Sequence, residues 1–284
     1  MLNIGWFSTG RDEAARQLLQ AVQESISTGE IKGKINFVFS NREPGESQES
    51  DLFFELVHGY GIPLIYFSYR KFKARLLRGA CPERDSSVAS LPQNDKKRRA
   101  RNDIFLTEKS KGWRIKYDRE VNRRIERFSP DLCVLAGYML IIGEELCQKY
   151  NIINLHPAPP GGPVGSWQEV IWKLIQSKAK EAGAMMHMVT PELDRGPVLS
   201  YCFFPINHKP FDQYWQKEDK EPLFKLIRQH ELDREFPLII FTLKALSRGE
   251  IAVQNGKVLD AQGNIIQGYD LTEEINRVMK GNST

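Results

Sequence analysis

The stretch that decides the fold lies near the middle of the chain and reads PDLCVLAGYM over residues 130–139. Its centre, Leu132–Ala136, is apolar at every position, and Pro130 and Gly137 mark turns on either side. A short strand without alternation is typical of a parallel sheet that helices cover on both faces. The residues beyond its carboxyl end, from Tyr138 on, then fall where such sheets bind ligands.

Other apolar stretches of strand length flank this one along the chain. They are Leu2–Phe7, Ile35–Phe39, Pro63–Phe67 and Ile152–Leu155. Residues 14–22 and Leu52–Val57, which lie between them, have helical spacing of apolar residues. Strands that alternate with helices predict an α/β, Rossmann-like fold with a mostly parallel twisted sheet and helices on both faces. We expect one domain over residues 1–284.

The pattern changes in the second half of the chain. Met185–Val189 and Val198–Ile206 read as strands, Leu223–Leu246 as a long helix, and 251–259 as a hairpin turning at Asn255-Gly256. Asp194 follows the strand at Met185–Val189 and comes just before a Gly-Pro turn.

The composition is that of an ordinary globular protein, with 41% hydrophobic and 27% charged residues in 284. The four cysteines form no C-x-x-C pair, so we expect reduced thiols, no structural metal and a cytoplasmic location. The longest uncharged apolar run, Cys133–Ile142, is half the ~20 residues of a membrane span. We therefore expect no membrane association.

The positive charge is concentrated in one segment. Between Arg70 and Arg101 there are eleven Lys or Arg residues against three acidic ones, more than the whole formal net charge of +4. Arg84–Asp103 is poor in large apolar residues, so we expect a basic, flexible insertion around 70–113. The run Lys96–Arg101 reads as a solvated loop, and we do not expect a nucleic-acid site.

Two positions after strands carry side chains suited to proton transfer. Asn154 and His156 are two apart in an extended segment and share a face. An Asp194 carboxylate beside His156 would orient the imidazole, and the Asn154 amide would donate to an oxyanion. From spacing alone, a capping or turn role for these residues stays open. Trp167 and His187 read as structural residues.

These segments resemble the glycinamide ribonucleotide formyltransferase family of purine biosynthesis. The resemblance is carried by Asn154–Pro157, by Met186–Val198 with its E-L-D-x-G-P-V motif, and by Phe37–Asn41 and Pro130–Met139 upstream. It extends in the same order along most of the chain, apart from about 70–113.

The resemblance implies that 10-formyltetrahydrofolate is the co-substrate and that its formyl group is transferred to a primary amine of a small, phosphorylated acceptor. Among such acceptors, phosphoribosylglycinamide is the first that we expect. Asn154, His156 and Asp194 would be the catalytic residues, and no metal is implied. The residues that would form the folate pocket are Tyr138, Met139, Leu140, Ile141, Ile142, Val189 and Thr190.

The acceptor side departs from the family pattern. The residues that we expect there are Thr9, Gly10 and Arg11 at the phosphate turn, together with Pro157 and Glu231. Asp12 and Glu13 oppose a phosphate if they point inward. Glu231 neighbours Leu232, which occupies the position of a family glutamate.

Formyl transfer to another amine acceptor stays open, and so do three other functions. A formyltetrahydrofolate deformylase carries a similar trio, but it has an additional domain before the catalytic one, and we expect none before Leu2. A methionyl-tRNA formyltransferase needs more chain after Asp194. A basic RNA-binding protein on the same scaffold would show salt-sensitive binding without turnover.

Overall fold

The computed structural model describes residues 1–79 and 112–281. The predicted loop Arg84–Asp103 and the run Lys96–Arg101 lie outside the described residues. On either side of this gap the chain is helical, at α3 (Tyr69–Gly79) and at residues 112–125.

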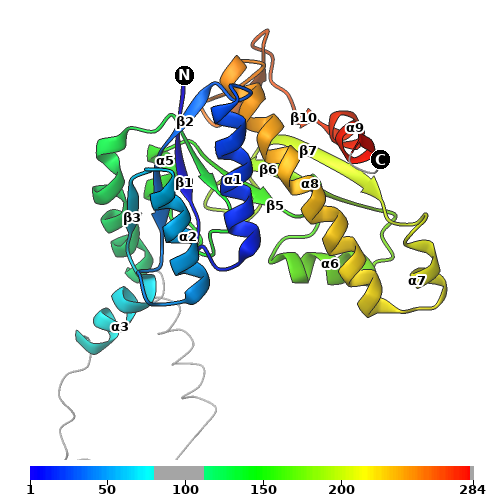
Figure 1. Ribbon diagram of the computed structural model, residues 1–284, viewed down its shortest axis with the longest axis horizontal. Helices are drawn as coiled ribbons and strands as arrows, with labels where there is room; N and C mark the ends of the chain where they lie inside the picture. The colour runs from blue at the N-terminus through cyan, green and yellow to red at the C-terminus, as the bar shows by residue number, and fades with distance from the viewer. Residues whose placement is uncertain (80–111, 282–284) are drawn as a thin grey trace, which may run out of the picture.

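The main sheet has eight strands in the order β10-β7-β6-β5-β4-β1-β2-β3 (Figure 1). Their bounds are β1 Leu2–Phe7, β2 Gly33–Ser40, β3 Leu64–Tyr66, β4 Leu132–Leu135, β5 Ile152–His156, β6 Glu181–Met188, β7 Val198–Pro205 and β10 Tyr269–Asp270. All neighbouring pairs are parallel except β5–β6 and β6–β7. The prediction of a mostly parallel sheet is therefore confirmed, and β6 is the strand that runs against the rest.

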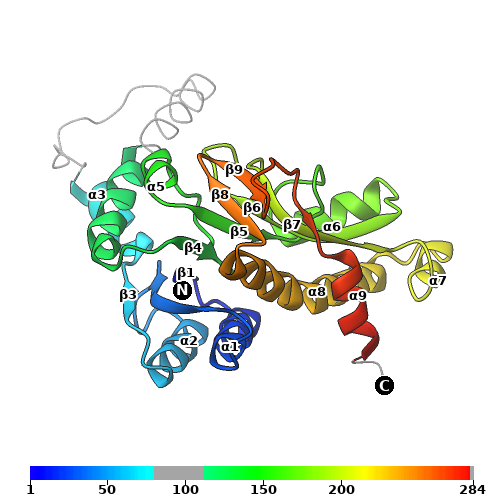
Figure 2. The same ribbon diagram turned by 90° about the horizontal axis from the view of Figure 1, so that it is seen from above.

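Helices cover both faces of the sheet (Figure 2). Their bounds are α1 Glu13–Ser27, α2 Gln48–Gly59, α5 Glu144–Lys149, α6 Trp167–Gln176, α7 Asp212–Gln216, α8 Lys220–Arg248 and α9 Thr272–Gly281. A small hairpin of β8 (Ile251–Gln254) and β9 (Lys257–Asp260) forms a second sheet, as predicted. The strand β10 and the helices α7 and α9 were not predicted.

Alternate side chains of the central strands enter different cores. Trp6 and Val134 pack on one face against α1, α2 and α8, whereas Phe7 and Leu135 pack on the other against helix 112–125 and α5. A third cluster joins α6 to β6, β7 and the start of α8. Burial on both faces explains why the central strands are apolar at every position.

The strand order marks the position at which sheets of this kind typically bind ligands. After β1 the chain moves outward to β2 and β3, whereas β4 and β5 lie on the other side of β1. The loops after β1 and β4 therefore leave the sheet in opposite directions and open a crevice between them. None of the described helices is long and apolar enough to cross a membrane.

Candidate active site

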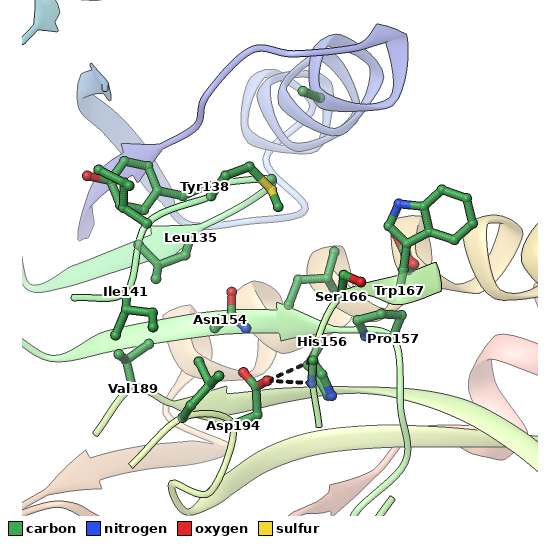
Figure 3. Close-up of a pocket in the computed structure, with 18 of the residues that line it drawn as sticks. Leu135, Tyr138, Ile141, Asn154, His156, Pro157, Ser166, Trp167, Val189 and Asp194 are labelled. Carbon is green, nitrogen blue, oxygen red and sulfur yellow. Dashed lines mark hydrogen bonds and ion pairs between the residues drawn. The ribbon is translucent and has the colours of Figure 1, made fainter. Parts of the chain in front are cut away.

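A pocket of about 400 Å³ lies at the carboxyl ends of β4 and β5 (Figure 3). Its walls are the start of α1, the loop after β4, the end of β5, the start of α6, the loop after β6 and one stretch of α8. Asn154, His156 and Asp194 all line it, so the structure brings the three predicted catalytic residues together.

Asp194 lies between two imidazole rings. Its Oδ2 is 3.8 Å from Nδ1 of His156, and its Oδ1 is 3.7 Å from Nε2 of His187. The ring centroids are 5.9 Å apart and the planes are nearly perpendicular. Both histidines are buried, so the carboxylate interacts with them in surroundings that screen charge weakly.

The loop after β6 returns Asp194 to the strand ends. Asp194 has a left-handed backbone with a φ of 52°, which is uncommon outside glycine. A Cβ at Gly196 would lie 1.9 Å from the carbonyl oxygen of Met188, so only glycine lets the loop come this close to β6. The Asp194 carboxylate also accepts a hydrogen bond from the Gly165 amide at 3.2 Å.

Hydrogen bonds to main-chain carbonyls set the ring tautomers. Nε2 of His156 donates to the Pro163 oxygen at 3.0 Å, which leaves Nδ1 to exchange a proton with the pocket. Nδ1 of His187 donates to the Met188 oxygen at 2.9 Å, which leaves Nε2 as an acceptor when the ring is neutral. Burial lowers the pKa of His187, and the nearby His156 lowers it further. A lowered pKa favours the neutral form of the His187 ring.

The Asn154 amide is oriented by His187. Its Nδ2 lies 3.2 Å from Nε2 of His187, which accepts one of its two hydrogens. The second hydrogen is left for a ligand in the pocket, as an oxyanion donor requires.

His187 was predicted to be a structural residue, and its buried side chain also lines the pocket. His187 stands opposite Asn154 in the register of β5 and β6. Its alternation with two methionines shows which face it shares with other residues of β6. It does not show that β6 pairs antiparallel with β5, and that pairing places the ring in the site.

The residues predicted to bind the folate all line the pocket: Tyr138, Met139, Leu140, Ile141, Ile142, Val189 and Thr190. Large hydrophobic side chains are exposed here, with Met139 at 47%, Ile141 at 41% and Leu193 at 49%. An exposed apolar group inside a pocket favours a flat apolar ring as the ligand.

The turn after β1 differs from the prediction. Arg11 lines the pocket, whereas Thr9 is buried, with its Oγ1 accepting the Met139 amide at 3.0 Å, and Gly10 packs on Phe53. Asp12 also lines the pocket, and its carboxylate caps α1 by accepting the Ala15 amide at 3.1 Å. A carboxylate therefore occupies the helix start at which a phosphate was expected.

Glu231, which was predicted to bind the acceptor, also lies elsewhere than predicted. It is fully buried and does not line the pocket, since its carboxyl lies beside Arg228 with 3.8 Å between Oε2 and Nη1. Burial, together with Glu235, raises the pKa of Glu231 well above its usual range. Because Glu231 is buried away from the pocket, it is not placed to contact a ligand there.

Arg228 and Glu235 line the pocket where Glu231 was expected. Nη1 of Arg228 donates to Glu235 at 2.6 Å, and the guanidinium lies over the Trp167 ring at 4.7 Å. Trp167, read from the sequence as core, also lines the pocket together with Pro157, which was predicted to lie there. No local pattern indicated this group, because it depends on which turn of α8 passes the pocket.

No group of three or more His, Cys, Asp or Glu side chains in the described ranges, 1–79 and 112–281, is placed to hold a metal ion.

Residues 86–214 match the family model described as formyl transferase. Phosphoribosylglycinamide formyltransferase of Escherichia coli is 32% identical over 94 residues, which are 32% of this chain and 42% of that protein. The enzyme of the same name from Schizosaccharomyces pombe is 38% identical over 100 residues, 33% of this chain and 48% of that protein. The chain thus spans less than half the length of these curated relatives.

Solved structures share the fold over nearly the whole chain. Phosphoribosylglycinamide formyltransferase of Coxiella burnetii has a TM-score of 0.65 at 17% identity, covering 95% of this chain and 98% of its own. A formyltetrahydrofolate deformylase of Pseudomonas syringae has a TM-score of 0.60 at 19% identity, covering 91% of this chain and 65% of its own. The segment that matches the formyl transferase model contains Asn154, His156 and Asp194.

Proposed function

We propose that this protein transfers the formyl group of 10-formyltetrahydrofolate to a primary amine, with phosphoribosylglycinamide as the acceptor, in the cytoplasm. One observation carries the proposal: a carboxylate between two buried imidazoles, with an amide donor beside them, lines a pocket of ligand size. Two relatives, 32% and 38% identical over about a third of this chain, are named as phosphoribosylglycinamide formyltransferases.

The reaction forms a bond between the acceptor nitrogen and the formyl carbon, and it breaks the bond from that carbon to N10 of the folate. The second hydrogen of the Asn154 amide stabilises the oxyanion between these steps. Nδ1 of His156 takes the proton that the amine loses and returns it to the leaving nitrogen. Asp194 stabilises the imidazolium that forms in between, and balances its charge.

The two ends of the pocket suit the two substrates. Figure 3 shows Tyr138, Ile141 and Val189 on one side of the catalytic residues and Ser166 and Trp167 on the other. The first side offers apolar side chains and the main chain of a loop to the pterin ring. On the second side, a guanidinium and a carboxylate offer hydrogen bonds to a polar acceptor.

The first test is to mix the purified protein with 10-formyltetrahydrofolate and follow tetrahydrofolate, with and without phosphoribosylglycinamide. The proposal expects turnover only when the acceptor is present. Formate and tetrahydrofolate without acceptor would instead make the protein a deformylase, as a 27% identical relative of Haemophilus influenzae is named. Folate binding without turnover in either mixture would overturn this choice of acceptor.

A further inference from the structure

The loop that follows β4 is held at both ends by hydrogen bonds to other elements. At its start, the Thr9 amide donates to the Gly137 oxygen at 3.1 Å, and Thr9 Oγ1 accepts the Met139 amide at 3.0 Å. At its end, the Gly143 amide donates to Oδ2 of Asp118 at 2.7 Å. The pocket-lining residues 140–142 lie between these attachments, so the two contacts set the shape of one pocket wall.

The contact with Gly143 comes from outside the pocket, because Asp118 belongs to helix 112–125 and does not line the pocket. It is 4% exposed, and its neighbours Tyr117 and Val121 point into the apolar core beneath β1 and β4. An ionised carboxylate is costly to bury unless it accepts hydrogen bonds. Burial raises the pKa of Asp118 to about 6, and the Gly143 amide opposes the shift. A carboxylate kept here at such a cost is placed for a specific partner.

The absence of a side chain at Gly143 makes room for this carboxylate. Its φ is −84°, which any residue adopts, so its conformation does not call for glycine. A Cβ at Gly143, however, would lie 2.3 Å from Oδ2 of Asp118. Glycine is required there for the close approach of the two groups.

We propose that Asp118 is a positioning residue, which holds the loop Met139–Ile142 through Gly143 in the shape that receives the folate. The inference rests on the proposed function and extends it, because Asp118 does not line the pocket. Its effect is on folate affinity, whereas the acceptor end and the proton transfer lie on other elements.

Three variants test the contact from both sides, with tetrahydrofolate as the binding probe. Asp118→Ala removes the acceptor, and Gly143→Ala forces the carboxylate away. Each should weaken tetrahydrofolate binding about tenfold, the value of one charge-assisted hydrogen bond. The double variant should bind no more weakly than either single one, since both changes break one contact. Asp118→Asn keeps an oxygen acceptor and should restore most of the affinity at about pH 7.5, where the wild-type carboxylate is ionised.

Arg119→Ala is the matched control. Arg119 lies next to Asp118 on the same helix and contacts α5 through Glu145, but it does not contact the loop. This variant should bind tetrahydrofolate like the wild type. In all variants the KM for the acceptor should stay within about twofold, which separates loop positioning from general loss of structure.

The pH dependence gives a second readout. The ionised carboxylate is the stronger acceptor, so the affinity of the wild type should fall as the pH drops through about 6. The groups that act on Asp118 electrostatically are Arg114, Tyr117, Tyr138, Glu145 and Cys147. These groups remain in Asp118→Asn, so the step should disappear in that variant and persist in Arg119→Ala.

The outcomes separate the two proposals. A wild type that does not bind tetrahydrofolate would overturn the proposed function. A wild type that binds it, with Asp118→Ala and Gly143→Ala folded and binding equally well, would overturn the positioning role. If Asp118→Ala does not melt cooperatively, Gly143→Ala and Asp118→Asn decide the same question.

Discussion

The two ends of the pocket differ in how the chain builds them. The proposed catalytic and folate end is made of the carboxyl ends of β4 and β5, His187 of β6, and the loops that follow β4 and β6, and these three strands are neighbours in the sheet. The acceptor end combines the first turn of α1 with one stretch of the 29-residue helix α8. The first end follows local rules, whereas the second depends on how distant helices pack.

The largest effect should come from His156 at the first end. His156→Ala removes the imidazole whose Nδ1 exchanges the proton, so kcat should fall about a thousandfold while folate binding is retained. Steady-state kinetics and tetrahydrofolate binding measure the two separately. His58→Ala, at an exposed position on α2, is the control. Near-normal turnover in His156→Ala would remove the proposed mechanism.

The next largest effect should come from the loop after β6, which positions the Asp194 carboxylate. Gly196→Ala pushes that loop from β6 because its Cβ would meet the Met188 oxygen. A displacement of about 1 Å at the carboxylate should lower kcat about a hundredfold. Gly59→Ala at the end of α2 adds a methyl group with no atom within 4 Å and should have no effect on kcat. Equal kcat values in both variants would show that the position of Asp194 does not limit the reaction.

The difference between the two ends also explains what the sequence could predict. The strands from Leu2 to His156 were predicted to within a few residues, since each is a short apolar run between turns. Asn154, His156 and Asp194 were found because they lie at strand ends and carry a family motif. Whether they act as proposed is for the variants above to decide.

What the sequence missed depends on long-range packing. His187 enters the site through the antiparallel register of β5 and β6, which no local pattern encodes. Glu231 was chosen on α8 because it neighbours the position of a family residue, yet Arg228 and Glu235 line the pocket and Glu231 is buried beside Arg228. Helical spacing gives the face of a helix, but not the depth of each side chain.

A third prediction tests whether Arg228 and Glu235 bind the acceptor at their end of the pocket. Arg228→Met combined with Glu235→Gln removes the ion pair without leaving one buried charge unpaired. The KM for the acceptor should rise about tenfold, whereas the KM for the formyl donor should stay within about twofold. Lys225→Met, on the same helix outside the pocket, serves as the control. A rise in the KM for the donor instead would place this group at the folate end.

The smallest effect should come from the first turn of α1, where Asp12 caps the helix and lines the pocket. Asp12→Asn keeps the capping oxygen but removes the negative charge that opposes a phosphate. The KM for phosphoribosylglycinamide should fall about threefold, and the KM for glycinamide, which has no phosphate, should not change. Glu13→Gln removes a charge from the same turn outside the pocket and controls for the overall field. An equal change for both acceptors would show that the phosphate does not bind beside α1, and would leave Arg228 as the cation to test for it.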